Sequence, residues 1–310
     1  MEYGAHLPLI ELDANTSSLT GLRAYADTAA RLGYSFLSAN DHLLYARPWL
    51  DGPTALAAVV DRAQGMTLAT TVCLPVIRGP VQTAKTVAAL DVLSGGRLVV
   101  GVAAGSSARD YEAAGIPFEE RWPRFEEATQ ALHALLHVDR PPLEGAFYST
   151  RDLELAPKPV QRPGPPIWIG SWGSRPGLRR VARIADGWLA SGYNTTPDAF
   201  RDARAYLETQ LTAVGKPAAA FPNGLVTVWL HVTEDRAAAD RFLADVLAPM
   251  LNRPVEALRS LHLPIGPAEL CAERLTAFSD AGVQRVFVWP LTNPLRQLEL
   301  FRERVVPLVR

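Results

Sequence analysis

The side chain best suited to proton transfer in this sequence is His42, which follows Asp41 directly after the short aromatic-rich run Tyr34–Asn40. Imidazole titrates near neutral pH, and an adjacent carboxylate can tune it for general acid or base catalysis. An ordinary loop histidine, held by its neighbours, would show the same pattern. The pair therefore indicates a candidate catalytic histidine, with a purely structural role as the alternative.

Small and hydroxyl residues gather after two further apolar runs. They are Ala104, Gly105 and Ser106 in one turn, and Gly170, Ser171, Trp172 and Gly173 in another. Backbone N–H groups at such turns, where a helix begins, can bind a phosphate because unpaired donors and the helix dipole act together. In any single turn the same residues could simply cap a helix. Aromatic residues lie nearby in sequence and could pack a planar cofactor or a substrate, namely Trp49, Trp172, Tyr193 and Trp289.

Other reactive side chains give weaker signals. Cys73 lies in an apolar run and Cys271 on an apolar helix face, so both are interpreted as small core residues. His133 and His137 have the spacing of a metal pair on a helix, but neither an HExxH motif nor a nearby Asp or Cys accompanies them. We interpret them, and His6 within the first strand, as structural and expect no metal in the active site.

The elements that must position these residues alternate between apolar runs and amphipathic helices. Eight runs are predicted to be strands: Ala5–Ile10, Tyr34–Asn40, Met66–Val76, Arg97–Ala103, Ile167–Gly170, Gly187–Ser191, Gly224–Val232 and Val283–Pro290. Continuous apolar runs are typical of parallel strands covered on both faces. Eight such units predict one (β/α)₈ barrel over residues 1–310, with its active site where the strands end.

Composition excludes several classes of function. The chain has 310 residues, with 31 basic and 32 acidic side chains and a formal net charge of −1. It therefore lacks the basic excess that binds nucleic acid or anionic lipid. No apolar run approaches the roughly 20 residues of a membrane helix, and the first residues lack the basic start of an export signal. We expect a cytoplasmic protein that binds neither nucleic acid nor membranes.

Several segments resemble the luciferase-like monooxygenase superfamily of flavin- or deazaflavin-dependent oxidoreductases. They read AARLGYSFL, SANDHLL, LATTVCLPVIRGPVQTAKTVAALDVLSGGRLVVGVAAGSS, PPIWIGSWGS and ARIADGW. The resemblance runs from about Ala5 to Tyr193 and returns in GPAELCAERLTAFSDAGVQRV. It implies a (β/α)₈ barrel that holds a flavin-type ring at the carboxyl ends of the strands, in agreement with the strand count.

The resemblance also implies roles for individual residues. Asp41 and His42 match the strand-end Asp-His of members that use the deazaflavin coenzyme F420, with His42 catalytic and Asp41 at the cofactor. Thr71 and Val72 match the third-strand bulge, where such members often have a non-prolyl cis peptide behind the cofactor ring. The turn at Ala104, Gly105 and Ser106 matches the ribityl and phosphate region, and the loop of Gly170, Ser171, Trp172 and Gly173 matches the site of the cofactor tail.

The resemblance leaves the reaction open between alternatives. We favour an F420-dependent enzyme that transfers a hydride between the deazaflavin and a small organic substrate. The alternatives are a monooxygenase that uses reduced FMN and a flavin-binding protein without turnover. Ser106 and Ala46 stand where sugar-phosphate dehydrogenases of this branch have Glu and Trp, which disfavours that activity. A homodimer is expected by resemblance only, and the pocket should be covered by Tyr45–Asp51, Ser107–Arg121 and Pro249–Ile265.

Overall fold

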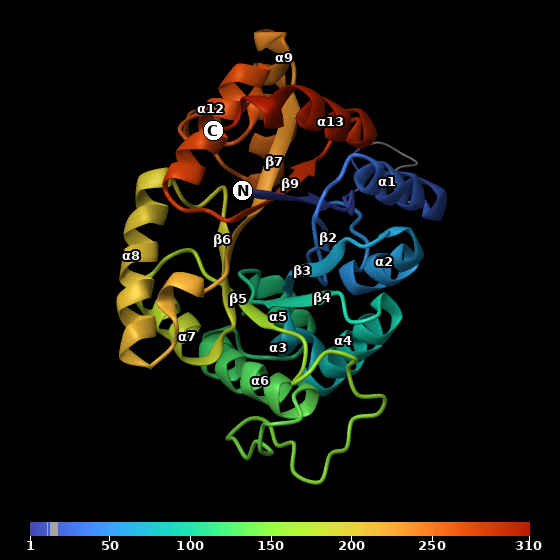
Figure 1. The fold of residues 1–310 in the computed structure, drawn as a ribbon, viewed down its shortest axis with the longest axis vertical. Coiled ribbons are helices and arrows are strands. Elements are labelled where there is room, and N and C mark those ends of the chain that lie inside the picture. The colour runs from blue at the N-terminus through green and yellow to red at the C-terminus, as the bar shows by residue number, and fades with distance from the viewer. Residues whose placement is uncertain (11, 13–17) are drawn as a thin grey trace.

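Eight parallel strands form a closed ring, which confirms the predicted (β/α)₈ barrel (Figure 1). The computed structural model describes residues 1–10, 12 and 18–310. Neighbouring strands follow the order β6-β5-β4-β3-β2-β1-β9-β7, and pairing of β6 with β7 closes the ring. Their bounds are β1 Glu2–His6, β2 Phe36–Ala39, β3 Thr67–Cys73, β4 Leu98–Val102, β5 Ile167–Gly170, β6 Gly187–Ser191, β7 Asn223–Val232 and β9 Arg285–Pro290.

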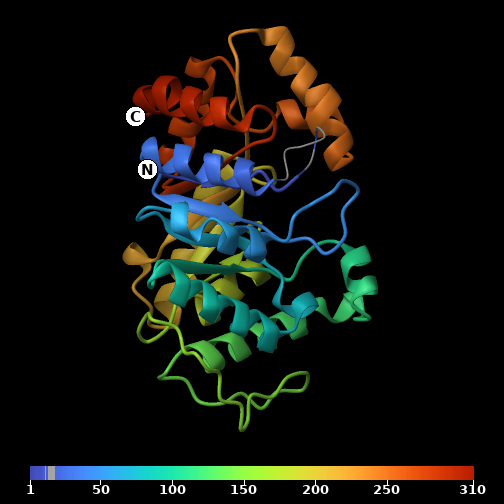
Figure 2. The same ribbon diagram turned by 90° about the vertical axis from the view of Figure 1, so that its right-hand side faces the viewer.

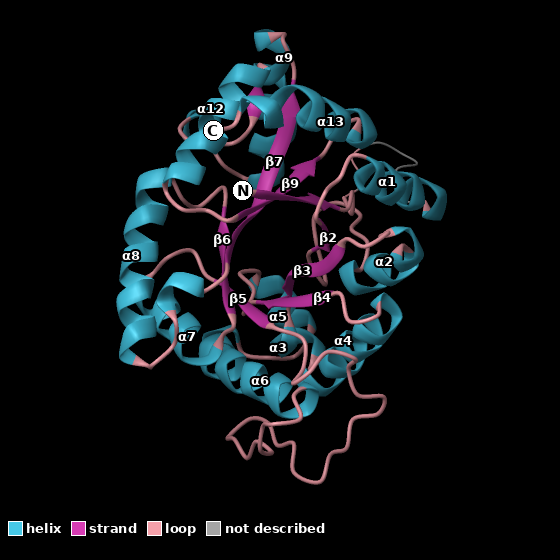
Figure 3. Cartoon of the chain, viewed as in Figure 1, coloured by secondary structure: helices cyan, strands magenta, loops and turns pink. Residues whose placement is uncertain are grey.

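Helices surround this ring (Figure 3). They are α1 Leu19–Arg31, α2 Gly52–Ala58, α3 Pro75–Arg78, α4 Pro80–Ser94, α5 Ala108–Ala113, α6 Arg121–Leu136, α7 Arg175–Ile184, α8 Pro197–Ala213, α9 Arg236–Arg241, α10 Ala248–Leu251, α11 Val255–Arg259, α12 Ala268–Asp280 and α13 Pro294–Leu300. Proline stands in the first turn of several of them, where its missing N–H is not needed. In the described part of the chain, no helix has the length and apolar character to cross a membrane.

The structure corrects several predicted boundaries. The first strand was expected over Ala5–Ile10, but β1 pairs with β9 from Glu2 and ends at His6, opposite Ser38. Beyond it, Ile10 forms an antiparallel bridge with Trp49 outside the barrel. Several short elements also escaped prediction, among them α5 and the strand β8 (Ile265–Gly266), which pairs with the end of β7. Both are too short to show a recognisable hydrophobic period.

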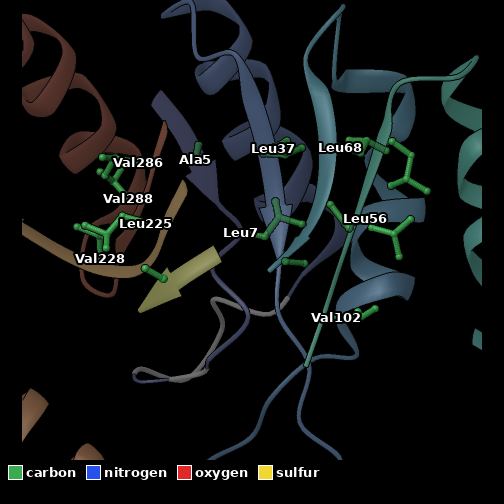
Figure 4. Close-up of a cluster of buried hydrophobic side chains, with 14 of the residues drawn as sticks. Ala5, Leu7, Leu37, Leu56, Leu68, Val102, Leu225, Val228, Val286 and Val288 are labelled. Carbon is green, nitrogen blue, oxygen red and sulfur yellow. The ribbon is translucent and has the colours of Figure 1, made fainter. Parts of the chain in front are cut away.

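The main core lies between the strands and the helices. Leu37, Leu68 and Val100 point outward from β2, β3 and β4 and are fully buried with residues of the surrounding helices, such as Leu56 of α2. Figure 4 shows this layer around β1, β2 and β3. Burial on both faces explains why the strands read as continuous apolar runs rather than as alternating patterns.

The inside of the barrel is filled by large side chains near the strands' amino-terminal halves. Phe36, Trp168, Leu189 and Phe287 form this inner cluster. Gly4 makes room for it, because a Cβ at that position would lie 2.6 Å from a ring carbon of Phe287. These side chains close the barrel at the amino-terminal ends of its strands. A ligand of the barrel interior is therefore expected at the carboxyl ends.

A third cluster lies over the carboxyl end of the barrel. Trp229 and Trp289 from the ends of β7 and β9 pack there with Ile10, Leu247 and Leu258. Leu247 ends a π-helical segment, Phe242–Leu247, that joins α9 to α10. We call this group the cap cluster, and it fixes α9 to α11 over the barrel mouth.

One buried carboxylate, among other contacts, attaches the extended stretch between α6 and β5 to the barrel. Asp91 in α4 accepts hydrogen bonds from the backbone N–H groups of Val160 (2.6 Å) and Gln161 (3.0 Å) and from the Gln161 side-chain amide (2.6 Å). Its side chain is fully buried. The removal of a buried acceptor with three donors leaves those donors without partners, which is more costly than the loss of the bonds alone.

We therefore expect Asp91→Ala to lower the free energy of unfolding by about 3 kcal/mol, because buried N–H groups lose their acceptor. Urea denaturation followed by circular dichroism measures this change. Limited proteolysis should also cut faster between residues 137 and 166. Glu154→Ala, an exposed position in the same stretch, is the control and should behave like wild type. Equal stability of Asp91→Ala and wild type would show that this carboxylate does not hold the stretch.

Candidate active site

The loop after β2, the helix α5 and the segment from α9 to α10 all rise on the same side of the barrel (Figure 2). This is the side on which the strands end. Contacts between the loops connect them there, since the Tyr45 hydroxyl donates to the Met250 carbonyl at 3.0 Å. The three segments expected to cover a pocket thus supply residues to one rim, which is where active sites of (β/α)₈ barrels lie.

His42 stands at this rim and is held by Asp110 from α5. Its Nδ1 lies 3.2 Å from Asp110 Oδ2, while the Leu44 N–H donates to Oδ1 at 2.8 Å. The Asp110 side chain is 1% exposed and that of His42 is 24% exposed. Burial raises the pKa of Asp110, but the hydrogen bonds from His42 and from the loop backbone outweigh it and lower the pKa overall. An ionised Asp110 therefore accepts from Nδ1–H and leaves Nε2 as the nitrogen that exchanges protons.

We expected the Asp41 carboxylate to tune His42, but the carboxylate that pairs with His42 is that of Asp110. The Asp41 carboxylate turns away and binds Arg78, with Nε to Oδ2 at 2.5 Å and Nη2 to Oδ1 at 2.7 Å. Arg78 also pairs with Asp51, which accepts from the Thr54 N–H at the start of α2. Successive residues of a strand point to opposite sides, and the chain turns after β2, so neighbours in sequence acquire different partners. Asp41 connects β2, α2 and α3 beneath the rim.

A continuous row of aromatic rings crosses the mouth. The ring centroids of His42 and Trp49 lie 4.7 Å apart, and those of Trp49 and Trp289 lie 5.6 Å apart. His6 stacks on Trp289 with centroids at 3.9 Å. Trp229 follows at 6.3 Å from Trp289. These surfaces suit a planar or apolar ligand, because aromatic side chains bury much area and still offer polar N–H edges.

Buried polar atoms in this region have no hydrogen-bond partner among the described residues. They are His6 Nε2, Ser38 Oγ, Asn40 Oδ1, Trp49 Nε1, Thr71 Oγ1, Trp229 Nε1 and Trp289 Nε1. Folded proteins leave few such atoms unsatisfied, and those that exist call for a ligand or another reason. Burial also lowers the pKa of His6 to about 3, so its ring is neutral. The mouth therefore fits a cofactor or substrate that carries both ring faces and polar edges.

The predicted flavin-site residues come from three adjacent strands. The peptide between Thr71 and Val72 is cis, as the resemblance implied. A Cβ on Gly170 would lie 3.2 Å from Val72 Cγ1, so the ends of β3 and β5 are close together. Gly105 has a positive φ of 83° and Gly173 one of 93°, which open the turns after β4 and β5.

The remaining predicted residues surround these turns. Ala104 is buried, and its carbonyl accepts from the Tyr111 hydroxyl of α5. Ser106 and Trp172 are exposed. Ser171 accepts from the indole N–H of Trp188 through its carbonyl at 2.9 Å. The second turn leads into α7, whose cap is the following Ser174, and this helix start supplies the backbone donors that an anionic cofactor tail needs.

Sequence analysis missed three residues of the mouth. Asp110 lies 68 residues from His42 and belongs to a helix too short to predict. His6 was interpreted as a structural residue inside the first strand, but it ends β1 and therefore faces the mouth. Trp229 lies inside β7, where the register with β9 shifts between Leu225 and Val228. A prediction that β1 ends at His6 would have placed this residue at the mouth.

A groove of about 970 Å³ opens at the opposite end of the barrel. Its lining includes Glu2, Leu207, Asn223 and Gln284, which surround the starts of β1, β7 and β9 next to α8. It contains none of the predicted site residues. Because conserved chemistry in this fold lies at the carboxyl ends of the strands, we place the active site at the rim and not in this groove.

The chain belongs to the luciferase-like monooxygenase family, whose model matches residues 6–252. An uncharacterised protein of Mycobacterium tuberculosis is 35% identical over 144 residues, which cover 46% of this chain and 49% of that protein. The chain thus spans about half the length of that relative.

Other relatives differ in the cofactor that they are named for. The F420-dependent glucose-6-phosphate dehydrogenase of Intrasporangium calvum is 30% identical and covers 91% of this chain and 92% of its own length. The FMNH₂-dependent dimethylsulfone monooxygenase of Pseudomonas putida is 35% identical but covers 38% of this chain and 33% of its own. An F420-dependent secondary alcohol dehydrogenase has the same fold, with a TM-score of 0.84 at 17% identity over 100% of this chain and 99% of its own.

The pairing of His42 with Asp110 predicts how the stability of the protein depends on pH. Asp110 has a lowered pKa in the folded protein, so its ionised form contributes stability above the ordinary value of 3.8 and loses it as the pH falls through the folded value. Asp110→Asn keeps an acceptor for Leu44 but cannot ionise. The difference in unfolding free energy between wild type and this variant should shrink as the pH falls below 3.8 and through the lower pKa of the folded state.

Urea denaturation at a series of pH values measures this difference. Glu112→Gln removes an exposed carboxylate from the same helix and is the matched control, for which we expect no such trend. Parallel pH profiles for wild type and Asp110→Asn would contradict the assigned pairing.

Proposed function

We propose that this chain is an oxidoreductase that uses coenzyme F420 and transfers a hydride between the deazaflavin and a small organic substrate. The observation that carries the proposal is the pairing of His42 with buried Asp110 at an aromatic mouth with unsatisfied polar edges. When bound, the deazaflavin supplies hydride exchange at the central carbon of its ring. The relatives named as F420-dependent, one of them similar over nine-tenths of this chain, support this choice.

Residues from three strands would hold the cofactor. Val72 would lie against its ring, and Gly170, which lies next to Val72 at the end of β5, would begin the loop that holds the cofactor tail. The turn at Gly105 and Ser106 and the start of α7 after Gly173 would bind its anionic tail with backbone N–H groups. This local arrangement suits a chain with a net charge of −1, because the donors do not require a basic surface.

His42 would carry the proton that accompanies hydride transfer. Its Nδ1–H donates to Asp110, so Nε2 accepts a proton when an alcohol is oxidised and returns it when a carbonyl is reduced. The negative charge of Asp110 stabilises the resulting imidazolium and fixes the orientation of the ring. The chain would thus provide a positioned proton carrier, whose side chain is 24% exposed.

The mouth favours an apolar substrate over a sugar phosphate. Its walls are indole rings, and the nearby guanidinium of Arg253 is engaged by the Tyr193 carbonyl at 3.0 Å and the Asn194 amide oxygen at 2.7 Å. Ser106 and Ala46, both exposed, carry no charge at the positions where the resemblance leads one to expect Glu and Trp. We propose a small alcohol or carbonyl compound with an apolar body.

A reduced-FMN monooxygenase is the second candidate, supported by the relative of that name. The two cofactors share a ring of similar shape, and so a direct comparison of binding decides between them. We expect the purified protein to bind F420 at least about tenfold more tightly than FMN. Quenching of coenzyme fluorescence during a titration gives both dissociation constants. Tight binding of FMN together with no affinity for F420 would overturn the choice of cofactor.

The role of His42 predicts a specific loss of turnover. His42→Ala should lower kcat by about 10²- to 10⁴-fold, the usual contribution of a positioned acid or base, while the dissociation constant of F420 changes little. Absorbance of the oxidised coenzyme, followed with a panel of small apolar alcohols, measures the rate.

The exposed neighbour Leu43 supplies the control, since Leu43→Ala should retain full activity. Unchanged turnover in His42→Ala would remove the proposed role of this residue. Tight binding of F420 without turnover on any alcohol or carbonyl of the panel would favour the binding protein without catalysis.

A further inference from the structure

Two histidines and an aspartate that lie away from the mouth form a compact cluster. His133 and His137 are one turn apart at the end of α6, and Asp186 lies between α7 and β6. One ligand-type atom from each residue lies within 4.8 Å of the others. Figure 1 shows α6 and α7 as neighbours on the outside of the barrel. The sequence shows no carboxylate close to the histidine pair. The fold supplies one, Asp186, from about 50 residues downstream.

Hydrogen bonds fix which nitrogen of each ring is free. His133 Nε2 lies 2.9 Å from the Ile184 carbonyl, and His137 Nε2 lies 3.0 Å from the Pro165 carbonyl. A carbonyl only accepts, so each Nε2 carries the hydrogen and each Nδ1 keeps its lone pair. Metal-binding histidines usually donate their second N–H to a carbonyl or carboxylate in this way.

The free nitrogen of His133 is buried without a partner in the described part of the chain, and Asp186 beside it is half-buried. His133 is 8% exposed, and its Nδ1 has no hydrogen-bond partner among the described residues. One oxygen of Asp186 accepts from the Ile167 N–H at 2.8 Å, which fixes the carboxylate and leaves its second oxygen available. A buried lone pair close to a carboxylate is unfavourable unless a proton or a cation lies between them.

Two positively charged side chains near the cluster disfavour the binding of a cation. Lys216, whose ammonium donates to the Ala185 carbonyl at 2.7 Å, and Arg140 both oppose a cation here. Burial lowers the pKa of His133, which favours the neutral form of its ring. A neutral imidazole is the form that binds a metal.

We propose that His133, His137 and Asp186 bind one divalent transition-metal ion, with zinc as the preferred metal. Two imidazole nitrogens and one carboxylate oxygen are a donor set typical of zinc, and water completes a tetrahedron. Ligand atoms around zinc lie about 3.3 Å apart for bonds of about 2.0 Å, so the three donor atoms, which lie within 4.8 Å of one another, must move closer together when the metal binds.

The metal would be structural. It lies next to the start of β6, at the amino-terminal end of the barrel, where residues serve stability rather than catalysis. It would tie the end of α6 to the turn before β6. This inference is independent of the proposed function, because none of its residues touches the mouth.

Titration of the untagged, chelator-treated protein tests the inference. Cobalt(II) should bind with one-to-one stoichiometry and give the visible absorption bands of a tetrahedral ion, and zinc should displace it. Zinc in hundredfold excess over its dissociation constant should raise the Tm by about 5 °C. Asp186→Asn, which keeps an acceptor for Ile167, and His137→Gln should each weaken zinc binding at least tenfold.

The neighbouring exposed carboxylate gives a matched control, since Asp139→Asn makes the same charge change and should leave zinc affinity intact. Circular dichroism verifies that each variant is folded. If His137→Gln is unfolded, the zinc affinity of Asp186→Asn alone tests the site. Unsaturable binding, or equal affinity in Asp186→Asn and wild type, overturns the site. F420 binding is measured in the same variants and should not change, so failure of this inference and failure of the proposed function remain distinguishable.

Discussion

Closure of the parallel sheet through the pairing of β6 with β7 is the constraint on which the rest of the structure depends. A parallel strand can follow another only through a crossover, so closure places the crossover helices outside and every strand end of the barrel at one rim. Residues from β1, β2, β3, β5, β7 and β9 meet there although they are scattered over the whole sequence. Large side chains fill the half of the barrel toward the amino-terminal ends of the strands, and the unpartnered polar atoms and aromatic rings lie toward the carboxyl ends.

Two adjacent residues at this rim, Asp41 and His42, have different partners. Asp41 binds Arg78 and, through it, the loop that leads to Asp51, so the backbone around His42 is held from below. His42 itself takes Asp110 from a different helix. A charge-assisted pair beneath the loop and a second one within it restrict the histidine to one place, as its proposed role as a proton carrier requires.

Most of the fold could be predicted from the sequence because strands buried on both faces leave an unmistakable pattern. Apolar runs such as Ile167–Gly170 and Gly187–Ser191 coincide with β5 and β6 to the residue. The rim glycines were found because they directly follow such runs. Partners that depend on tertiary contact were not found: Asp110 and Asp186 come from elements distant in sequence from the histidines they approach. Local periodicity carries no information on such pairs, whereas strand order, once known, does.

The cap cluster gives the mouth a wall that is not part of the barrel. Trp229 and Trp289 belong to both, since each packs with α9 to α11 on one side and with the row of rings on the other. Side chains of α10 and α11 therefore influence the shape of the mouth from behind, without touching what binds in it. Substitutions that repack this small outer core can change the shape of the mouth while leaving the turns after β4 and β5 in place.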